Sequence, residues 1–418
     1  MSLHHRDPPM APSRQSRHAH DVLRTLWPEP ARIRAVRWPL FRRVHAPLEY
    51  IPLPSRANTK MLIPRRPLRA TATAVRNYKT SASASTQRRL DTLATAARLG
   101  LADSLPWMLA IYPDRSSPDA DIAQYLMSVM GRPLALGIHI GPGRAVQKPV
   151  IQLIDADGST CGFTKVGTRA LTRKLVRDEV ATLAIVGGVP HRTFRVPRVL
   201  HDGQWHGNEV LVLEPLISSP AEPRLPRRVA EAMVELAQIG PASREMVSTS
   251  GYWGDLRQQI DELPSSRYSL RLAASLDRVK LVANDIELVF GASHGDWTPW
   301  NMAMADGQVI LWDWEYFRFG VPLGFDALHF RIQGAVSRGS SPARAFLDAA
   351  SSTTELLGPC GLIDQIAADL VVTLYVIDIA TRYIRDGELQ AGTAMGQLDD
   401  WLTLVLDRQD QRLDEHRS

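Results

Sequence analysis

The residues best suited to chemistry lie in two short segments of the C-terminal half. Residues 294–301 read His-Gly-Asp-Trp-Thr-Pro-Trp-Asn, and residues 309–315 read Val-Ile-Leu-Trp-Asp-Trp-Glu. Asp306-Gly307 lies between them, and Asp-Gly flanked by apolar residues is a strong hairpin signal. Pairing about this turn brings Asn301 and Asp313 together at the mouth of the hairpin, where cross-strand neighbours lie roughly 4.5–5.5 Å apart. An amide oxygen and a carboxylate so placed could share a hard cation such as Mg²⁺.

The spacing Asp-x-x-x-x-Asn, followed by an apolar strand that ends in Asp, resembles the catalytic loop and metal-binding segment of the kinase-like superfamily. The closest resemblance is to the aminoglycoside phosphotransferase and choline kinase branch, because the loop opens His-Gly-Asp and the metal motif reads Asp-Trp-Glu. The resemblance implies an α+β, two-lobed protein kinase-like fold with an antiparallel-sheet N-lobe and a mainly helical C-lobe. It also implies that ATP and Mg²⁺ are used.

The same resemblance assigns roles to three residues. Asp296 would accept or orient the proton of an acceptor hydroxyl, while Asn301 and Asp313 would hold Mg²⁺ between phosphate oxygens. The competing interpretation is that Asp296 and Asn301 are turn residues and that Asp313 caps a strand end. We expect His294 to support the loop by hydrogen bonding, whereas Glu315 stays open between an outer-shell and a structural role.

Four tryptophans surround this motif, and packing is favoured over stacking on a sugar ring. They are Trp297, Trp300, Trp312 and Trp314.

Upstream, residues 134–140, 149–154 and 160–166 read as a small antiparallel meander. Lys165 lies on its third strand and shares a face with Phe163, so an ordinary snorkelling lysine is one interpretation. Glu179 projects from the apolar stripe of the following helix and needs a partner if it is buried. In the resembling family a Lys and a Glu pair, and the Lys contacts the α- and β-phosphates of ATP. We therefore predict a pair of Lys165 with Glu179, with Asp178 as the alternative helix residue.

The remaining nucleotide contacts are predicted at two turns. Gly141 and Gly143 would let backbone N–H groups approach phosphates, although a plain hairpin turn explains them nearly as well. Glu214 and Leu216 follow the fifth strand where a hinge between lobes is expected. Their backbone would hydrogen-bond adenine, with the Leu216 N–H as the better donor because Pro215 has none.

The motif favours a small-molecule acceptor over a protein. Thr298 stands where protein kinases carry Lys, and only twelve residues separate Asp313 from Asp326. That interval is too short for a phosphorylated activation loop. We expect Asp326 to support the catalytic loop. The acceptor itself is not readable, but the acidic body mildly favours an amino sugar, a sugar or an amino alcohol, bound within the helical lobe near residues 252–263 and 362–406.

Charge and composition divide the chain unevenly. Residues 1–100 carry 19 Lys and Arg against 5 Asp and Glu, although the whole chain of 418 residues has a net charge of only +5. This basic front lacks interleaved aromatic residues, which argues against nucleic acid and favours a solvated tail; recruitment of a protein partner is a further role open to it. We expect a poorly ordered basic arm over 1–46, an additional N-terminal α/β module over 47–130, the ATP-binding N-lobe over 131–216 and the helical C-lobe over 217–418.

Two cysteines and no metal-binding cysteine pattern indicate a reducing compartment, the cytoplasm. The longest apolar run, residues 370–377, is flanked by Asp369 and Asp378, so no membrane span is expected.

Two other functions compete with a small-molecule kinase. A metal-dependent hydrolase would use His294, Asp296, Asp313 and Glu315 as ligands and would need no nucleotide. A catalytically silent kinase-like module would only bind partners. The joint presence of the predicted nucleotide, catalytic and metal residues argues against silence, because a silent module has no chemical need for all of them.

Overall fold

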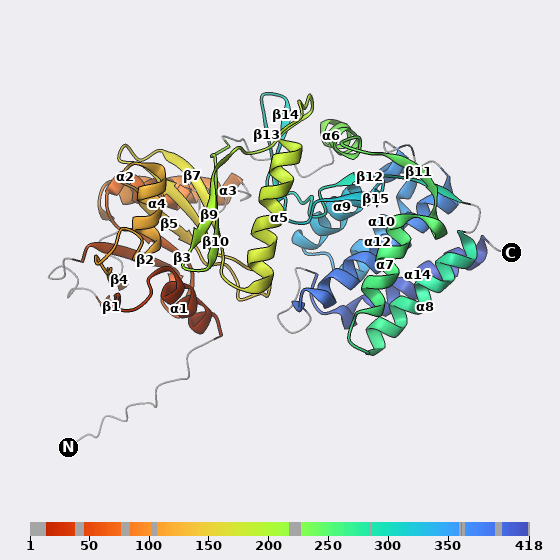
Figure 1. Cartoon of the computed structure of the whole chain (residues 1–418), viewed down its shortest axis with the longest axis horizontal. Helices are drawn as coiled ribbons and strands as arrows, with labels where there is room; N and C mark the ends of the chain where they lie inside the picture. The colour runs from red at the N-terminus through yellow and green to blue at the C-terminus, as the bar shows by residue number, and fades with distance from the viewer. Residues whose placement is uncertain are drawn as a thin grey trace, which may run out of the picture. The chain divides into compact units, whose positions relative to one another are not determined.

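The computed structural model describes residues 14–37, 46–76, 84–101, 107–216, 227–283, 286–358, 361, 364–388 and 395–416. These residues form two compact units. The first comprises residues 1–143, 147–172 and 200–215, and the second comprises 144–146, 173–199 and 216–418. The first unit is built around an antiparallel sheet and the second is mainly helical (Figure 1). The predicted α+β kinase-like fold class is confirmed.

A nine-stranded sheet forms the centre of the first unit. In spatial order its strands are β1 (Arg32–Arg37), β4 (Trp107–Tyr112), β2 (Leu48–Ser55), β3 (Asn58–Pro64), β5 (Ala135–His139), β6 (Val150–Ile154), β7 (Thr160–Gly167), β10 (Asn208–Leu213) and β9 (Val199–Trp205). The predicted meander is present as β5, β6 and β7, which pair antiparallel in sequence order. Helices α1 (Arg14–Leu26), α2 (Leu68–Arg76), α3 (Ala84–Arg98) and α4 (Ile122–Met130) complete the unit.

The predicted boundary between residues 130 and 131 runs through this one sheet. Strand β3, from the expected N-terminal module, pairs with β5, the first strand of the expected N-lobe, through Met61↔His139 and Leu62↔Ile138. The local patterns identified the strands, but only this long-range pairing decides which of them share a sheet. The two segments therefore form one structural unit.

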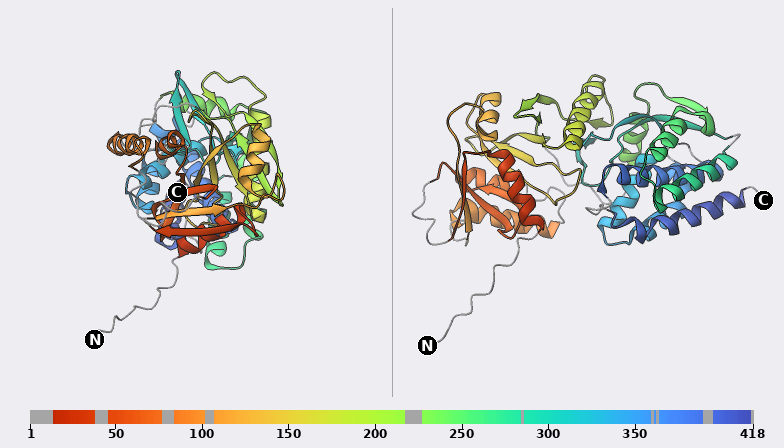
Figure 2. Two further views of the ribbon diagram at one scale, coloured as in Figure 1. Left: turned by 90° about the vertical axis from the view of Figure 1, so that its left-hand side faces the viewer. Right: turned by 60° about the horizontal axis from the view of Figure 1, so that its bottom comes forward.

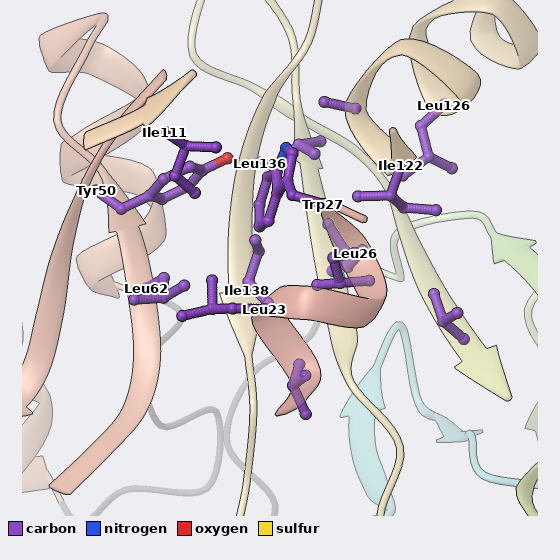
Figure 3. Packing of buried hydrophobic residues seen from close by; sticks show 14 of the residues in the cluster. Leu23, Leu26, Trp27, Tyr50, Leu62, Ile111, Ile122, Leu126, Leu136 and Ile138 are labelled. Carbon is purple, nitrogen blue, oxygen red and sulfur yellow. The ribbon is translucent and has the colours of Figure 1, made fainter. Parts of the chain in front are cut away.

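The first unit has a continuous apolar core to which the N-terminal segment contributes (Figure 3). Leu26 and Trp27 are fully buried, and Leu23 packs in the same cluster as Leu62 and Ile138. The expected poorly ordered arm is thus wrong for residues 14–37, which form α1 and β1. Burying one side of an amphipathic helix offsets the conformational entropy that ordering costs. Residues 1–13 and 38–45 lie outside the described part.

Helices dominate the second unit. They are α5 (Ala170–Val186), whose first three residues belong to the first unit, α6 (Arg227–Ala237), α7 (Gly251–Asp261), α8 (Arg267–Val282), α9 (Phe325–Ser337), α10 (Pro342–Ser351), α11 (Thr353–Leu357), α12 (Gln365–Arg385) and α14 (Leu402–Glu415), with short 3-10 turns η3 (Val247–Thr249) and η5 (Leu398–Asp400). Helices α8, α12 and α14 lie side by side, as Figure 2 shows. Among the described residues, none of the helices combines the length and apolarity that crossing a bilayer requires.

Two small three-stranded sheets in this unit carry the predicted motif. One contains β11 (Ser243–Met246), β12 (Glu287–Ser293) and β15 (Arg318–Pro322), and the other contains β13 (Met302–Ala305), β14 (Gln308–Leu311) and β8 (Phe194–Arg195). The β13–β14 hairpin has the predicted register, from Met302↔Leu311 to Ala305↔Gln308. Asp306 and Gly307 both have positive φ, as a two-residue turn of this kind requires.

Candidate active site

The predicted catalytic loop begins where β12 ends, and hydrogen bonds connect it to the start of α9. The carboxylate of Asp326 accepts hydrogen bonds from the Ser293 hydroxyl (3.0 Å) and from the backbone N–H groups of His294 (2.9 Å) and Gly295 (3.0 Å). Asp326 lies in the first turn of α9, where the helix dipole favours a negative charge. One buried carboxylate therefore fixes the backbone that carries Asp296.

Gly295 allows a close approach that no other residue would permit. Its φ is +75°, and a Cβ at this position would lie 2.2 Å from the backbone oxygen of Tyr316. On the other side, Nη1 of Arg382 donates to the Gly295 carbonyl at 2.6 Å, and the guanidinium lies 4.2 Å from the centre of the Tyr316 ring. The pKa of Arg382 is raised although burial lowers it, because Tyr316 and acidic groups face it. Arg382 thus acts as a fixed cation behind the loop.

His294 is fully buried and both ring nitrogens bond to backbone within the motif. Nε2 donates to the Trp312 carbonyl at 3.1 Å, and Nδ1 accepts the backbone N–H of Asp296 at 3.2 Å. This pattern requires a neutral imidazole, and burial lowers the pKa of His294 accordingly. The residue makes the supporting bonds expected of it.

Asp296 is held from both sides while its side chain stays 29% exposed. Oδ2 accepts from Nδ2 of Asn301 at 2.8 Å, and Oδ1 lies 2.9 Å from Nε2 of His329. An ionised carboxylate can only accept, so Nε2 of His329 is the protonated nitrogen. Nδ1 of His329 lies 2.8 Å from the Tyr375 hydroxyl, whose pKa is raised well above 10 by burial and which therefore remains a donor. The Asp296 carboxylate is oriented with lone pairs left for a substrate.

The metal-ligand candidates lie at the open end of the β13–β14 hairpin. The backbone N–H of Trp312 donates to the Asn301 carbonyl at 3.1 Å, which extends the hairpin pairing to the position predicted for Asn301. Because Nδ2 of Asn301 faces Asp296, its Oδ1 is the atom left for a cation. Asp313 adopts φ +64°, an uncommon conformation for a residue other than glycine and one enriched at functional sites. An amide oxygen and a carboxylate suit Mg²⁺.

The helix predicted to carry the ATP-anchoring carboxylate is α5. Glu179 has no exposed surface, and its Oε1 accepts from the backbone N–H of Trp314 at 3.3 Å. Asp178 instead forms a half-exposed pair with Lys174, at 2.5 Å, which excludes it as the buried partner. Lys165 is buried on β7 of the first unit. Its pairing with Glu179, which belongs to the second unit, stays a prediction.

Other parts of the protein contact the turn that carries Gly141 and Gly143. The N–H of Gly141 donates to the Lys60 carbonyl at 3.3 Å, and its own carbonyl accepts from Gln15 of α1 at 2.9 Å. A Cβ on Gly143 would lie 3.3 Å from the His18 ring. The Gly141 N–H therefore has a protein acceptor in this structure, and contacts of Gly141 and Gly143 with phosphate stay predictions. The positive φ of Gly141, +70°, accounts for the glycine as a turn residue.

The predicted adenine contacts follow β10. Glu214 and Leu216 are both half-buried and directly follow the last residue of the strand, Leu213. Their contacts with adenine stay predictions. Two of the four tryptophans, Trp297 and Trp314, have no exposed surface, as expected for packing residues.

A cavity of about 430 Å³ opens beside Asp296 in the second unit, within the size range of small-molecule sites. Trp300, Glu315, Tyr316 and Arg382 contribute to its wall. A larger cavity, of about 1230 Å³, lies between α6, α9 and α11 and includes none of the predicted site residues. The smaller cavity is therefore the candidate acceptor site.

Sequence reasoning missed His329 and Arg382. Both act on the loop from far along the chain, 33 residues from Asp296 and 87 residues from Gly295 respectively. A signal for His329 was nevertheless present: it lies three residues after Asp326, so the two side chains share a face of α9. No comparable pattern marked Arg382 within the apolar sequence of α12.

The sequence resemblance is confirmed by comparison with known proteins. Residues 162–354 match the model of the phosphotransferase enzyme family, and this segment includes the whole motif. A search of curated proteins found no match.

Structural comparison gives distant similarities. The aminoglycoside phosphotransferase APH(4)-Ia is 15% identical, with 70% of this chain and 97% of that chain covered and a TM-score of 0.45. A putative fructosamine-3-kinase from Haemophilus somnus 129PT is 15% identical, with 70% and 96% covered and a TM-score of 0.42. Another from Thermobifida fusca YX-ER1 is 18% identical, with 62% and 98% covered and a TM-score of 0.37.

Proposed function

Residues 162–354 match the phosphotransferase enzyme family, and on this basis we propose that the protein is an ATP-dependent small-molecule kinase. It would transfer the γ-phosphoryl group of ATP to a hydroxyl of an amino sugar, a sugar or an amino alcohol. The observation that carries the proposal is the Asp296 carboxylate, oriented by Asn301 and His329 at the edge of a cavity large enough for such an acceptor.

In the proposed reaction each site residue has a separate role. The acceptor oxygen forms a bond to the γ-phosphorus while the bond from that phosphorus to the β,γ-bridging oxygen breaks, and ADP leaves with the electron pair. Asp296 orients the acceptor hydroxyl and receives its proton. Asn301 and Asp313 would hold Mg²⁺, which when bound neutralises phosphate charge. Lys165, paired with Glu179, would position the α- and β-phosphates, and the backbone after β10 would hold adenine.

Two rival functions fit the site less well. In a metal hydrolase His294 would be a ligand, but its Nε2 proton is donated to Trp312 and its Nδ1 accepts a backbone N–H. Across the residues the structure covers, no three or more His, Cys, Asp or Glu side chains are grouped to hold a metal ion. A catalytically silent module would have no need for a carboxylate that two side chains orient.

The test is the substitution Asp296→Asn. We expect it to abolish phosphoryl transfer while Mg·ATP binding, measured by calorimetry with and without Mg²⁺, stays within about twofold, since Asp296 contacts the acceptor and not the nucleotide. Asp348→Asn is the matched control, because Asp348 is a half-exposed carboxylate that pairs with Arg344. Unchanged turnover in Asp296→Asn would remove this residue from its role.

A further inference from the structure

The cavity beside Asp296 contains a buried amide with an unused hydrogen-bonding atom. Gln333 lies on α9 and is only 3% exposed. Its Nε2 donates to the Tyr383 hydroxyl at 3.1 Å, whereas, among the described residues, its buried Oε1 has no hydrogen-bond partner. Burial of such an atom costs free energy unless a ligand or water satisfies it. Both Gln333 and Tyr383 line the cavity.

Tyr383 adds a second neutral group to the same wall. Burial raises the pKa of its hydroxyl to about 12, so it remains protonated near neutral pH. A phenol that accepts one hydrogen bond still has its own proton to donate. Gln333 and Tyr383 together therefore offer one acceptor and one donor, which is the complement of an alcohol hydroxyl.

The cavity wall carries charges of both signs, namely Arg144, Asp296, Glu315, Arg382 and Glu388. Asp296 is bonded to Asn301 and His329, and Arg382 is bonded to the Gly295 carbonyl and stacked on Tyr316. Burial raises the pKa of Glu388, with Arg144 acting against that rise. A cationic acceptor would have to enter beside Arg382, and an anionic one beside Asp296. Either would meet a like charge in a partly desolvated site.

Asp296 and Gln333 line the same cavity, and α9 connects them. His329, which orients Asp296, and Gln333 are four residues apart on α9, so their Cβ atoms are roughly 5–6 Å apart on one helix face. A ring with several hydroxyls could present one to Asp296 and another to Gln333. Resting on the proposed kinase function, we propose that the acceptor is a neutral polyhydroxylated compound, a sugar or cyclitol, and that Gln333 and Tyr383 select it by a hydroxyl that is not phosphorylated.

The test uses the full-length protein in two stages. Calorimetry with Mg·ATP alone examines the kinase proposal, and absent binding counts against that proposal directly. With binding established, ADP release and phosphorus NMR are followed with sugars and cyclitols, each beside its amino and its carboxylate counterpart. We expect kcat/KM for the neutral member to exceed both counterparts by at least about tenfold. Preference for a charged member, or no turnover of any neutral member while Mg·ATP binds, would overturn the proposal.

Substitutions at Gln333 test the selecting group. Gln333→Ala should raise the KM for the neutral acceptor about tenfold, with kcat and the KM for ATP within about twofold, because the lost bond holds ground and transition states equally. Gln333→Glu should shift the preference toward the amino counterpart. Gln258→Ala is the control, since Gln258 is an exposed residue of α7. An unchanged acceptor KM in Gln333→Ala would overturn the assignment.

Discussion

Among single residues, His329 gives the most direct prediction for the rate of phosphoryl transfer. It donates to Asp296 and is itself fixed by Tyr375. We expect His329→Ala to lower kcat by roughly 10- to 100-fold, because a misoriented catalytic group costs up to about that factor. The KM for ATP should not change, and His329→Gln, which keeps an N–H donor, should recover part of the rate. His416→Ala is the matched control, since His416 forms a similar pair with Asp369, 3.0 Å apart, away from the loop. Equal losses in both variants would contradict a positioning role.

His294 predicts a pH dependence of stability. Burial lowers its pKa below the ordinary 6.5, so the unfolded chain binds the proton more readily than the folded protein. The contribution of neutral His294 is complete above pH 6.5 and declines as the pH falls below it. Thermal unfolding at pH 8 and pH 5.5 should therefore show a larger loss in the natural protein than in His294→Gln. Parallel losses would show that the pKa of His294 does not differ between the folded and the unfolded protein.

Part of the candidate site could be predicted from the sequence alone. Asp296, Asn301 and Asp313 could be predicted as site residues because the motif depends on spacing within twenty residues and on the turn at Asp306-Gly307. For Gly141 the sequence showed only conformational freedom, because the acceptor of its N–H, the Lys60 carbonyl, lies 81 residues away. Residues that act within one short segment can therefore be predicted from the sequence, whereas the groups that contact them depend on the tertiary structure.

The loop between β12 and β13 permits a matched test of close packing. Gly295 and Gly307 share φ +75°, but a Cβ on Gly295 would meet the Tyr316 carbonyl at 2.2 Å, whereas one on Gly307 would meet nothing within 4 Å. Gly307→Ala should cost only about 1 kcal/mol of unfolding free energy and leave kcat nearly intact. Gly295→Ala should in addition displace the loop and lower kcat by roughly 100-fold or more. Similar kinetics for the two variants would show that the loop tolerates displacement.

Among elements, the hairpin and the meander were predicted correctly because alternation and Asp-Gly turns act over a few residues. Helix α1 was underestimated for the opposite reason. Its residues 14–26 have a strongly polar composition, and its apolar positions become meaningful only against the sheet that they cover. Periodicity identifies a helix more reliably when the helix is long, and α1 has 13 residues.

For the molecule as a whole, the N-terminal segment is expected to be essential to stability. Trp27 is fully buried, with a ring centroid 5.6 Å from that of Tyr50. Trp27→Ala should lower the unfolding free energy of the first unit by about 3–5 kcal/mol, the usual cost of such a cavity. Calorimetric or denaturant unfolding would measure it, with Trp300→Ala, at a half-buried tryptophan of the second unit, as the comparison. A loss below about 1 kcal/mol would show that the segment is only loosely attached.

The pairing of β3 with β5 has a practical meaning for anyone who wishes to shorten the protein. The family match begins only at residue 162, so alignment alone suggests a fragment cut near that point or just before β5. A cut just before β5 would remove β3, its neighbour in the sheet, and a cut near residue 162 would remove β5 and β6 as well. Either would leave unpaired backbone donors and acceptors at the new sheet edge beside an uncovered apolar face. Edges of that kind recruit other chains, so trimming to the shared family region should yield aggregates in place of a minimal enzyme.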